Sequence, residues 1–355
     1  MVVMAFAAGT DSLVAPARGA TKAPPSDLDP EVPAREAFKR TALACLAHAQ
    51  ANVGLVQAHG DHEGLHQFRV AFRRLRSLLS LFREVCRDDP EAMAIKARLR
   101  AMTVLLGPAR DLDVFLEGHP ELAEDDRAKV EYHRVAAYAE IEEFLGGPVW
   151  PQLLADLDRW LESGAAVLAL STEPGSGHAV VVRALSRRRA RIIHGGADLT
   201  SLTAEERHRV RIEAKKLRYG CQFFGSMWPG DADRVATLEK RLGRLQDSLG
   251  SLNDRATWEQ LRVRCGLEHV EPPEVDEDGL LCEAQDYVAR IEHSRPFWVP
   301  RPPALSPFEA VRRWAEPVAR AGAVAVRVGS AAAQLGGGAA RSLVGAFRRF
   351  VGGRG

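Results

Sequence analysis

The sequence predicts an all-α protein built from two related helical halves. Ala, Leu, Arg and Glu dominate the middle of the chain, aromatic residues make up only 6%, and apolar residues recur at helical spacing without strand-like alternation. A long segment also occurs twice, because the stretch from His66 to Asp111 is repeated from His208 to Asp254. With 46% hydrophobic residues among 355, the chain can bury a substantial core.

The apolar periodicity predicts the helices in order. The expected ranges are about 34–58, 62–87, 91–106, 109–117, 121–145 and 149–169 in the first half, and about 178–194, 203–227, 231–249, 252–265 and 279–293 in the second. Asp61 can cap the second of these helices, and Thr203 with Glu206 forms a capping box ahead of the helix from 203. Gly107-Pro108 is expected to break the chain before another helix start.

Both ends of the chain are predicted to lie outside the helical halves. Residues 1–33 are rich in Gly, Pro, Ala and Thr without periodicity, which predicts a flexible leader. The halves are expected at 34–172 and 178–298, joined near Gly175-Ser176-Gly177. Residues 299–355 begin as a Pro-rich linker and continue as a low-complexity Ala/Gly/Arg tail, in which 332–350 is a weaker candidate for an amphipathic helix.

The cysteines and the hydropathy indicate a cytoplasmic protein. Five cysteines are scattered along the chain without a C-x-x-C pair, which argues against a disulfide framework and predicts reduced thiols. No run reaches the roughly 18 apolar residues that a membrane span needs. The net charge of +1 does not identify a partner, but basic stretches at 69–87 and 183–218 and acid-rich stretches at 117–143 and 268–292 predict a polarised surface.

Each copy of the repeat carries a line of cations on one helix face. A His is followed by bases at +3, +7, +8 and +10, which gives His66, Arg69, Arg73, Arg74 and Arg76 in the first copy and His208, Arg211, Lys215, Lys216 and Arg218 in the second. At about 100° per residue, all but Arg74 and Lys216 fall within about 80° of arc. We call His66, Arg69, Arg73 and Arg76 the first stripe, and His208, Arg211, Lys215 and Arg218 the second stripe.

The stripes favour an extended polyanion as ligand. Each runs roughly 15 Å at about 1.5 Å per residue, which suits several phosphates in a row better than a single one. A solvated helix face usually mixes acids and bases, but the first stripe contains no acid and Glu213 falls off the second. Unrelieved like charge costs stability, so a bound anion is expected to offset it.

Other charged residues are secondary candidates. Further bases recur at i, i+4 spacing, namely Lys96 with Arg100, Lys240 with Arg244, and the row Arg183, Arg187 and Arg191. For each of these an ordinary surface position or an intramolecular ion pair is favoured over ligand contact. Asp111, Asp113 and Asp254 follow the Leu-Gly positions, and we expect them to orient cations rather than to bind a metal.

A zinc motif overlaps the first stripe. His62, Glu63 and His66 match H-E-x-x-H, in which two imidazoles bind Zn and the Glu acts as general base, and Glu84 or Glu91 could supply a third ligand. The second copy has no counterpart of His62 or Glu63. Zinc is therefore the weaker hypothesis, and no metal or cofactor is expected.

The repeated strings resemble a known family. HQFRVAFRRLRSLLSLF with LLGPARDLDV, and HRVRIEAKKLRY with LQDSLGSLND, closely resemble the CHAD family, the conserved histidine α-helical domain, over about residues 34–298. The resemblance implies two pseudo-symmetric helical bundles that enclose a basic channel. It also implies non-enzymatic binding of inorganic polyphosphate, at polyphosphate granules. The family's His and basic positions fall on His66, Arg69, Arg73, Arg76, His208, Arg211, Lys215 and Arg218.

Two rival functions remain open. Stripes of Arg also suit a nucleic-acid backbone, although single-strand binding favours stacking aromatics and the stripes offer almost none beyond Tyr219. The other rival is an enzyme, either a zinc hydrolase through His62, Glu63 and His66 or a polyphosphatase.

Overall fold

The computed structural model describes residues 19–57, 61–267, 269–272 and 274–300, without the side chains of Asn253, Asp254 and Ala256. These residues are all-α, as predicted, and no strand occurs among them. Residues up to Val299 belong to one compact unit, to which the following description refers. Residues 1–18 of the predicted leader and residues 301–355 of the predicted tail lie outside the described ranges.

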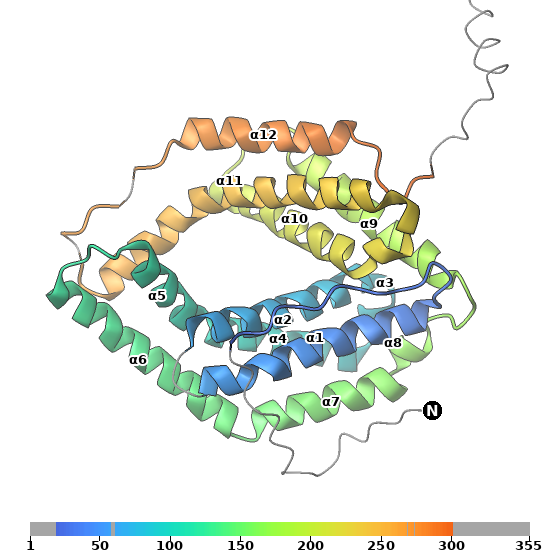
Figure 1. Ribbon diagram of the computed structural model, residues 1–355, viewed down its shortest axis with the longest axis horizontal. Helices are drawn as coiled ribbons and strands as arrows, with labels where there is room; N and C mark the ends of the chain where they lie inside the picture. The colour runs from blue at the N-terminus through green and yellow to red at the C-terminus, as the bar shows by residue number, and fades with distance from the viewer. Residues whose placement is uncertain (1–18, 58–60, 268, 273, 301–355) are drawn as a thin grey trace, which may run out of the picture. The chain divides into compact units, whose positions relative to one another are not determined.

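The first half packs around a central pair of helices (Figure 1). Its helices are α1 (Ala34–Gln57), α2 (His62–Leu81), α3 (Arg83–Cys86), α4 (Pro90–Leu105), α5 (Gly107–Gly118), α6 (Glu124–Gly146), α7 (Val149–Ser163) and α8 (Ala165–Leu168). α1 and α2 pack along each other, and the predicted Asp61 cap begins α2. Phe68 and Phe72 lie edge-on to Trp150 at 5.6 and 5.8 Å between ring centroids, so the apolar flank of α2 is buried against α7.

The second half consists of longer helices. They are α9 (Ser176–Gly195), α10 (Ala204–Phe224), the 3-10 turns η1 (Gly225–Met227) and η2 (Pro229–Asp231), α11 (Ala232–Arg264) and α12 (Glu277–His293). The capping box of Thr203 and Glu206 starts α10 as predicted. α10 packs between α9 and α11, and α12 covers α11.

The predicted break between 249 and 252 is wrong, because α11 continues through it. In the first copy α5 begins at Gly107, with Pro108 in its first turn, whereas Ser251 follows Gly250 and leaves the backbone hydrogen bonds intact. Gly250 has a packing role instead. A Cβ at this position would lie 2.7 Å from Arg211 Nη2, so the glycine makes room for that guanidinium.

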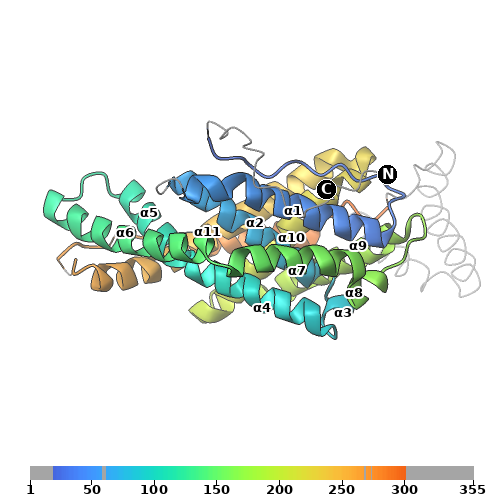
Figure 2. The same ribbon diagram turned by 90° about the horizontal axis from the view of Figure 1, so that it is seen from below.

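The two halves meet in two places. At the first, α2 packs on α10 and α9, where Arg188 donates to the backbone oxygen and the hydroxyl of Ser80. At the second, α11 reaches α5, and Trp258 Nε1 donates to His119 Nε2 at 3.3 Å. Figures 1 and 2 both show this end of α11 beside α5. The halves are therefore joined where α2 packs on α9 and α10, and again at the end of α11.

Residues 19–33 contradict the prediction of a flexible leader, because they pack against both halves. We call them the strap. Leu28 and Val32 are each only 5% exposed, and Gly175 N donates to Glu31 O at 2.8 Å. A Cβ at Gly177 would lie 2.5 Å from Val32 O, so glycine allows this close approach. The proline-rich composition of this segment gave no periodic signal for its two buried apolar residues, Leu28 and Val32.

The cysteines and the helix lengths agree with the expectations from sequence. All five cysteines are free thiols; Cys282 is exposed, and the other four are buried. Burial raises the pKa of the Cys45 thiol to about 11, which keeps it protonated and unreactive near neutral pH. Within the described ranges, no helix is long and apolar enough to cross a membrane.

Asp89 is expected to be a main support of the first half. Its carboxylate caps α4 through Ala92 N at 3.0 Å and accepts from Ala166 N at 2.8 Å and from Trp160 Nε1 at 3.3 Å. Asp89→Ala leaves these buried donors unpaired, so we expect the free energy of unfolding to fall by about 2–4 kcal/mol in chemical denaturation. Asp88→Ala removes only an exposed pair with Arg87 and should cost under about 1 kcal/mol; equal losses would contradict this role.

Candidate functional site

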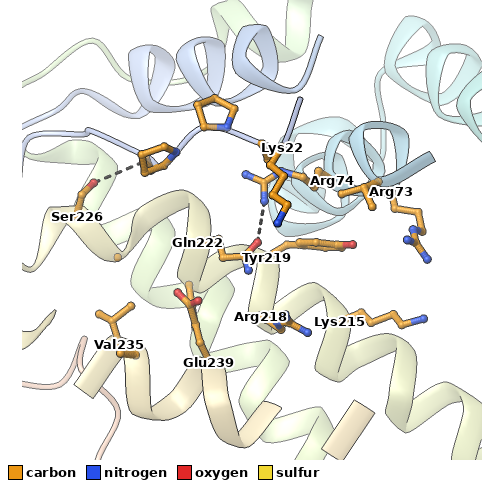
Figure 3. Close-up of a pocket in the computed structure, with 18 of the residues that line it drawn as sticks. Lys22, Arg73, Arg74, Lys215, Arg218, Tyr219, Gln222, Ser226, Val235 and Glu239 are labelled. Carbon is orange, nitrogen blue, oxygen red and sulfur yellow. Dashed lines mark hydrogen bonds between the residues drawn. The ribbon is translucent and has the colours of Figure 1, made fainter. Parts of the chain in front are cut away.

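A large open pocket lies between α2, α10, the first part of α11 and the strap (Figure 3). Its volume is about 930 Å³, and basic side chains from both halves line it. α2 contributes His66, Arg73 and Arg74, and α10 contributes Arg211, Lys215 and Arg218. Members of both stripes therefore meet at this site, which we call the basic pocket. A continuous channel through the protein stays a prediction.

Helical periodicity explains which side chains reach the pocket. On α2 the lining residues His66, Val70, Arg73 and Arg74 recur at spacings of three and four, and the lining residues of α10 do the same from Arg211 to Gln222. Burial of Phe68 and Phe72 at no more than 1% exposure fixes the rotation of α2 about its axis. The cations consequently face the opposite way, toward the second half.

Three guanidinium groups of the first stripe carry buried donors without acceptors. Arg69 Nη1, Arg73 Nε and Arg76 Nε are buried and make no hydrogen bond with any residue that the structure describes. An unsatisfied buried donor costs roughly 1–3 kcal/mol, and more for a charged group. Of these three residues only Arg73 is in the pocket lining, so its guanidinium is the one placed to donate to oxygen atoms of a ligand.

Arg69 and Arg76 stand behind the pocket rather than in its lining. Burial, together with repulsion from the neighbouring Arg73, lowers the pKa of Arg69 to about 10, although the charge of Asp111 acts in the opposite direction. Arg76 Nη1 donates to Thr103 Oγ1 at 3.2 Å on α4. Both guanidiniums remain charged near neutral pH, so they add positive potential to the pocket without lining it.

The second stripe is held by α11. Arg211 Nε donates to Gln246 O at 3.3 Å, and the side chain lies against Gly250. Lys215 and Arg218 line the pocket directly (Figure 3). His208 is exposed and is not among the lining residues, so the sequence-based pairing of His66 with His208 in one site is not what the structure shows.

The two off-stripe bases have different roles. Arg74, which lies off the arc of the first stripe, lines the pocket but is only 8% exposed. Its Nη1 donates to Gln222 Oε1 at 2.7 Å, and its guanidinium lies 4.7 Å from the centroid of the Phe223 ring, so it bridges the halves at the pocket floor. Lys216 is paired with Glu213 at 2.7 Å and lies outside the basic pocket.

Most of the basic residues that were secondary candidates lie away from the basic pocket. In the α9 row, Arg183 and Arg187 pair with Glu84, and Arg191 pairs with Glu213 at 3.7 Å, which confirms the ion-pair interpretation for these three. Lys96 lines a separate small pocket, and Arg100 is exposed near Arg76. Lys240 and Arg244 are exposed on α11 and share a shallow pocket with Arg218, so they extend the basic surface.

The orienting aspartates only partly match expectation. Asp113 accepts from Arg134 Nε at 2.7 Å and from Tyr138 Oη at 2.8 Å, so it orients groups on α6 rather than a stripe. The charge of Asp111 supports Arg69, as predicted. The side chain of Asp254 lies outside the described residues.

The H-E-x-x-H residues have other partners. His62 Nδ1 contacts Glu117 Oε1 at 2.5 Å, and Glu63 Oε1 accepts from Gln67 Nε2 at 2.7 Å. The described residues include no group of three or more His, Cys, Asp or Glu side chains arranged to hold a metal ion.

A family model assigns the chain. The model of the CHAD domain matches residues 40–263, which is more than half of the sequence and spans both stripes. The chain belongs to the CHAD domain family. Polyphosphate binding is a known property of this family, so membership supports a polyphosphate-related role.

A solved structure agrees with this assignment at the level of the fold. The crystal structure of the CHAD domain from the plant Ricinus communis matches at 24% identity and a TM-score of 0.59, covering 79% of this chain and 93% of that one. PptA from Streptomyces chartreusis matches at 13% identity and a TM-score of 0.45, covering 73% of this chain and 95% of that one. No curated protein matches the sequence.

The pocket of this CHAD protein also contains residues that the sequence patterns missed. Lys22 comes from the strap, and Glu239 and Asp247 come from α11. Burial raises the pKa of Glu239, and the charge of Arg218 opposes that rise. Glu239 and Asp247 are eight residues apart on one helix, a spacing that could have flagged them, whereas Lys22 stands in a segment without periodicity.

His66 is expected to be neutral at pH 7 in the free protein. Burial lowers the pKa of this imidazole, and repulsion from Arg110 and Arg73 adds to the effect, while Glu63 opposes it. Histidine NMR titration should therefore give His66 a pKa below 6.5, and Arg110→Gln should raise it. A pKa at or above 6.5 in the wild-type protein would contradict this electrostatic account.

Proposed function

We propose that this CHAD protein binds inorganic polyphosphate in the basic pocket and does not itself catalyse a reaction of it. The observation that carries the proposal is the convergence of stripe cations from α2 and α10 on one pocket. The family assignment supports the same ligand class. We further propose that the protein acts in the cytoplasm, in association with polyphosphate granules.

The pocket suits a linear polyanion chemically. Arg73 and Lys215 approach it from different halves, so successive phosphates of one chain can be neutralised on two sides. Of the three arginines with an unpartnered buried donor, Arg73 lines the pocket, where its guanidinium can meet phosphate oxygens, whereas Arg69 and Arg76 contribute positive potential. Binding relieves the mutual repulsion of the cations.

Binding of polyphosphate without catalysis requires only cations and hydrogen-bond donors in the pocket. The cations and hydrogen-bond donors of the lining hold phosphate oxygens, and Arg is well suited to bidentate contacts with them. Such a site retains the polymer by charge neutralisation and releases it when salt competes for the same cations.

Charge reversal in the pocket is expected to abolish polyphosphate binding. Arg73→Glu with Lys215→Glu changes the charge on both walls, and we expect at least a hundredfold loss of affinity for long-chain polyphosphate at moderate salt. Fluorescence titration or retention on immobilised polyphosphate measures the effect, and wild-type protein in the same incubations should release no orthophosphate.

A matched control separates the site from the total charge. Arg159→Glu with Arg290→Glu alters exposed pairs in the two halves by the same net charge and should change affinity less than about threefold. Undiminished binding by the pocket variant, with its helical circular dichroism intact, would refute the location of the site.

Nucleic-acid binding is the second candidate, because Tyr219 and Trp228 line the pocket and offer aromatic rings for stacking. Trp228 already packs against His178 and Phe297, and two rings provide little stacking beside the many cations, so polyphosphate should displace a labelled single-stranded RNA at a tenfold or greater advantage in phosphate equivalents. Competition titration at equal ionic strength decides between the two, with Tyr219→Leu as a control. An RNA advantage that Tyr219→Leu removes would favour the nucleic-acid function.

A further inference from the structure

The strap crosses the basic pocket between two fixed points. At its upstream point, Thr21 N donates to Asn52 Oδ1 at 2.9 Å, and Asn52 Nδ2 donates to Thr21 O at 2.9 Å. Asn52 is fully buried on α1, and His48 Nε2 lies 3.0 Å from the same Thr21 oxygen. The backbone of Thr21 is therefore clamped to the first half by buried side chains.

At its downstream point the strap is fixed to the second half. Leu28 N donates to Ser226 Oγ at 2.9 Å, the same hydroxyl lies 3.2 Å from Leu28 O, and Ser26 Oγ donates to Phe223 O. Leu28 itself is buried. The segment between Thr21 and Ser26 thus bridges the two halves whose stripes face the pocket.

The bridging segment has a defined shape and one charge. Pro24 and Pro25 fix two φ angles and favour an extended backbone, so little conformational entropy remains between the two points. Lys22, Ala23, Pro24, Pro25 and Ser26 all line the basic pocket. Figure 3 shows the Lys22 side chain directed into the pocket beside Arg74 and the Tyr219 ring.

Lys22 is placed to contact a ligand. It makes no hydrogen bond or ion pair with any of the described residues, whereas Lys39 and Lys129 are paired with Glu162 and Asp126. It also lies on a different wall from either stripe, so its charge reaches a face of the ligand that the helices do not cover.

We infer that the strap forms a third wall of the pocket and that Lys22 is an additional polyphosphate-binding residue. The inference rests on the proposed function, because it assumes that polyphosphate occupies the basic pocket. The Thr21 clamp positions Lys22, and the two prolines hold it over the stripes. Polyphosphate is then enclosed by cations from α2, from α10 and from the strap.

Single substitutions at Lys22 test the inference. Removing one phosphate contact should weaken affinity about threefold to tenfold and reduce the slope of log affinity against log salt by about one. We expect this for Lys22→Ala, a larger loss for Lys22→Glu and near-wild-type binding for Lys22→Arg. Arg264→Glu, an exposed charge reversal in the last turn of α11, should change affinity less than twofold.

Amine labelling of the unaltered protein gives an independent measurement. Acetylation of Lys22, followed by mass spectrometry, should slow several-fold when long-chain polyphosphate is added, whereas Lys129 should react at an unchanged rate. Suppose that Arg73→Glu with Lys215→Glu loses binding. The inference about Lys22 would then be overturned by unchanged affinity and salt slope in the Lys22 variants, or by an unchanged acetylation rate of Lys22 in the complex. Retained binding by that pocket variant would instead overturn the proposed function.

Discussion

Repulsion among the closely placed cations of the first stripe is the constraint on which the site depends. Arg69, Arg73 and Arg76 follow one another on a helix face that contains no carboxylate, and each keeps a buried donor without an acceptor. The pKa of Arg69 falls because burial and Arg73 both disfavour its charge. Such an arrangement is unfavourable in isolation, so the surrounding fold has to hold it in place.

The seam between α2 and the second half supplies that hold. Arg188 binds Ser80 across it, the Phe82 and Phe224 rings lie 6.1 Å apart, and Arg74 reaches Gln222 at the pocket floor. A Cβ at Gly220 would lie 2.5 Å from Leu185 Cδ2, so α9 and α10 approach as closely as glycine permits. Apolar burial along this seam offsets the free-energy cost of bringing the cations together. The nearby acid Glu213 pairs with Arg188 and Lys216, which do not line the pocket.

Local patterns predicted the helices and most of the pocket cations, because the same 3.6-residue period that buries Phe68 and Phe72 turns Arg73 toward the other half. These patterns gave wrong predictions where contacts between residues far apart in the sequence determine the local structure. Gly250 corresponds to Gly107 in the repeat, but it makes room for Arg211 inside an unbroken helix. The chain break of the first copy depends on Pro108, which the second copy lacks. His208 has the same offset as His66, but the packing of α10 leaves it exposed. The strap carries no periodic signal because its backbone is held by side chains of α1 and η1.

The unbroken course of α11 makes the two halves mechanically different. Where the first half divides its corresponding segment into α4 and α5, α11 runs for 33 residues, about 50 Å at 1.5 Å per residue, without a hinge. Glu239 and Asp247 lie in the first half of this helix, and Trp258 lies near its other end, against His119. The junction of Trp258 with His119 and the acidic side chains of the basic pocket therefore stand on one continuous helix, whereas the first half has a chain break at the corresponding place.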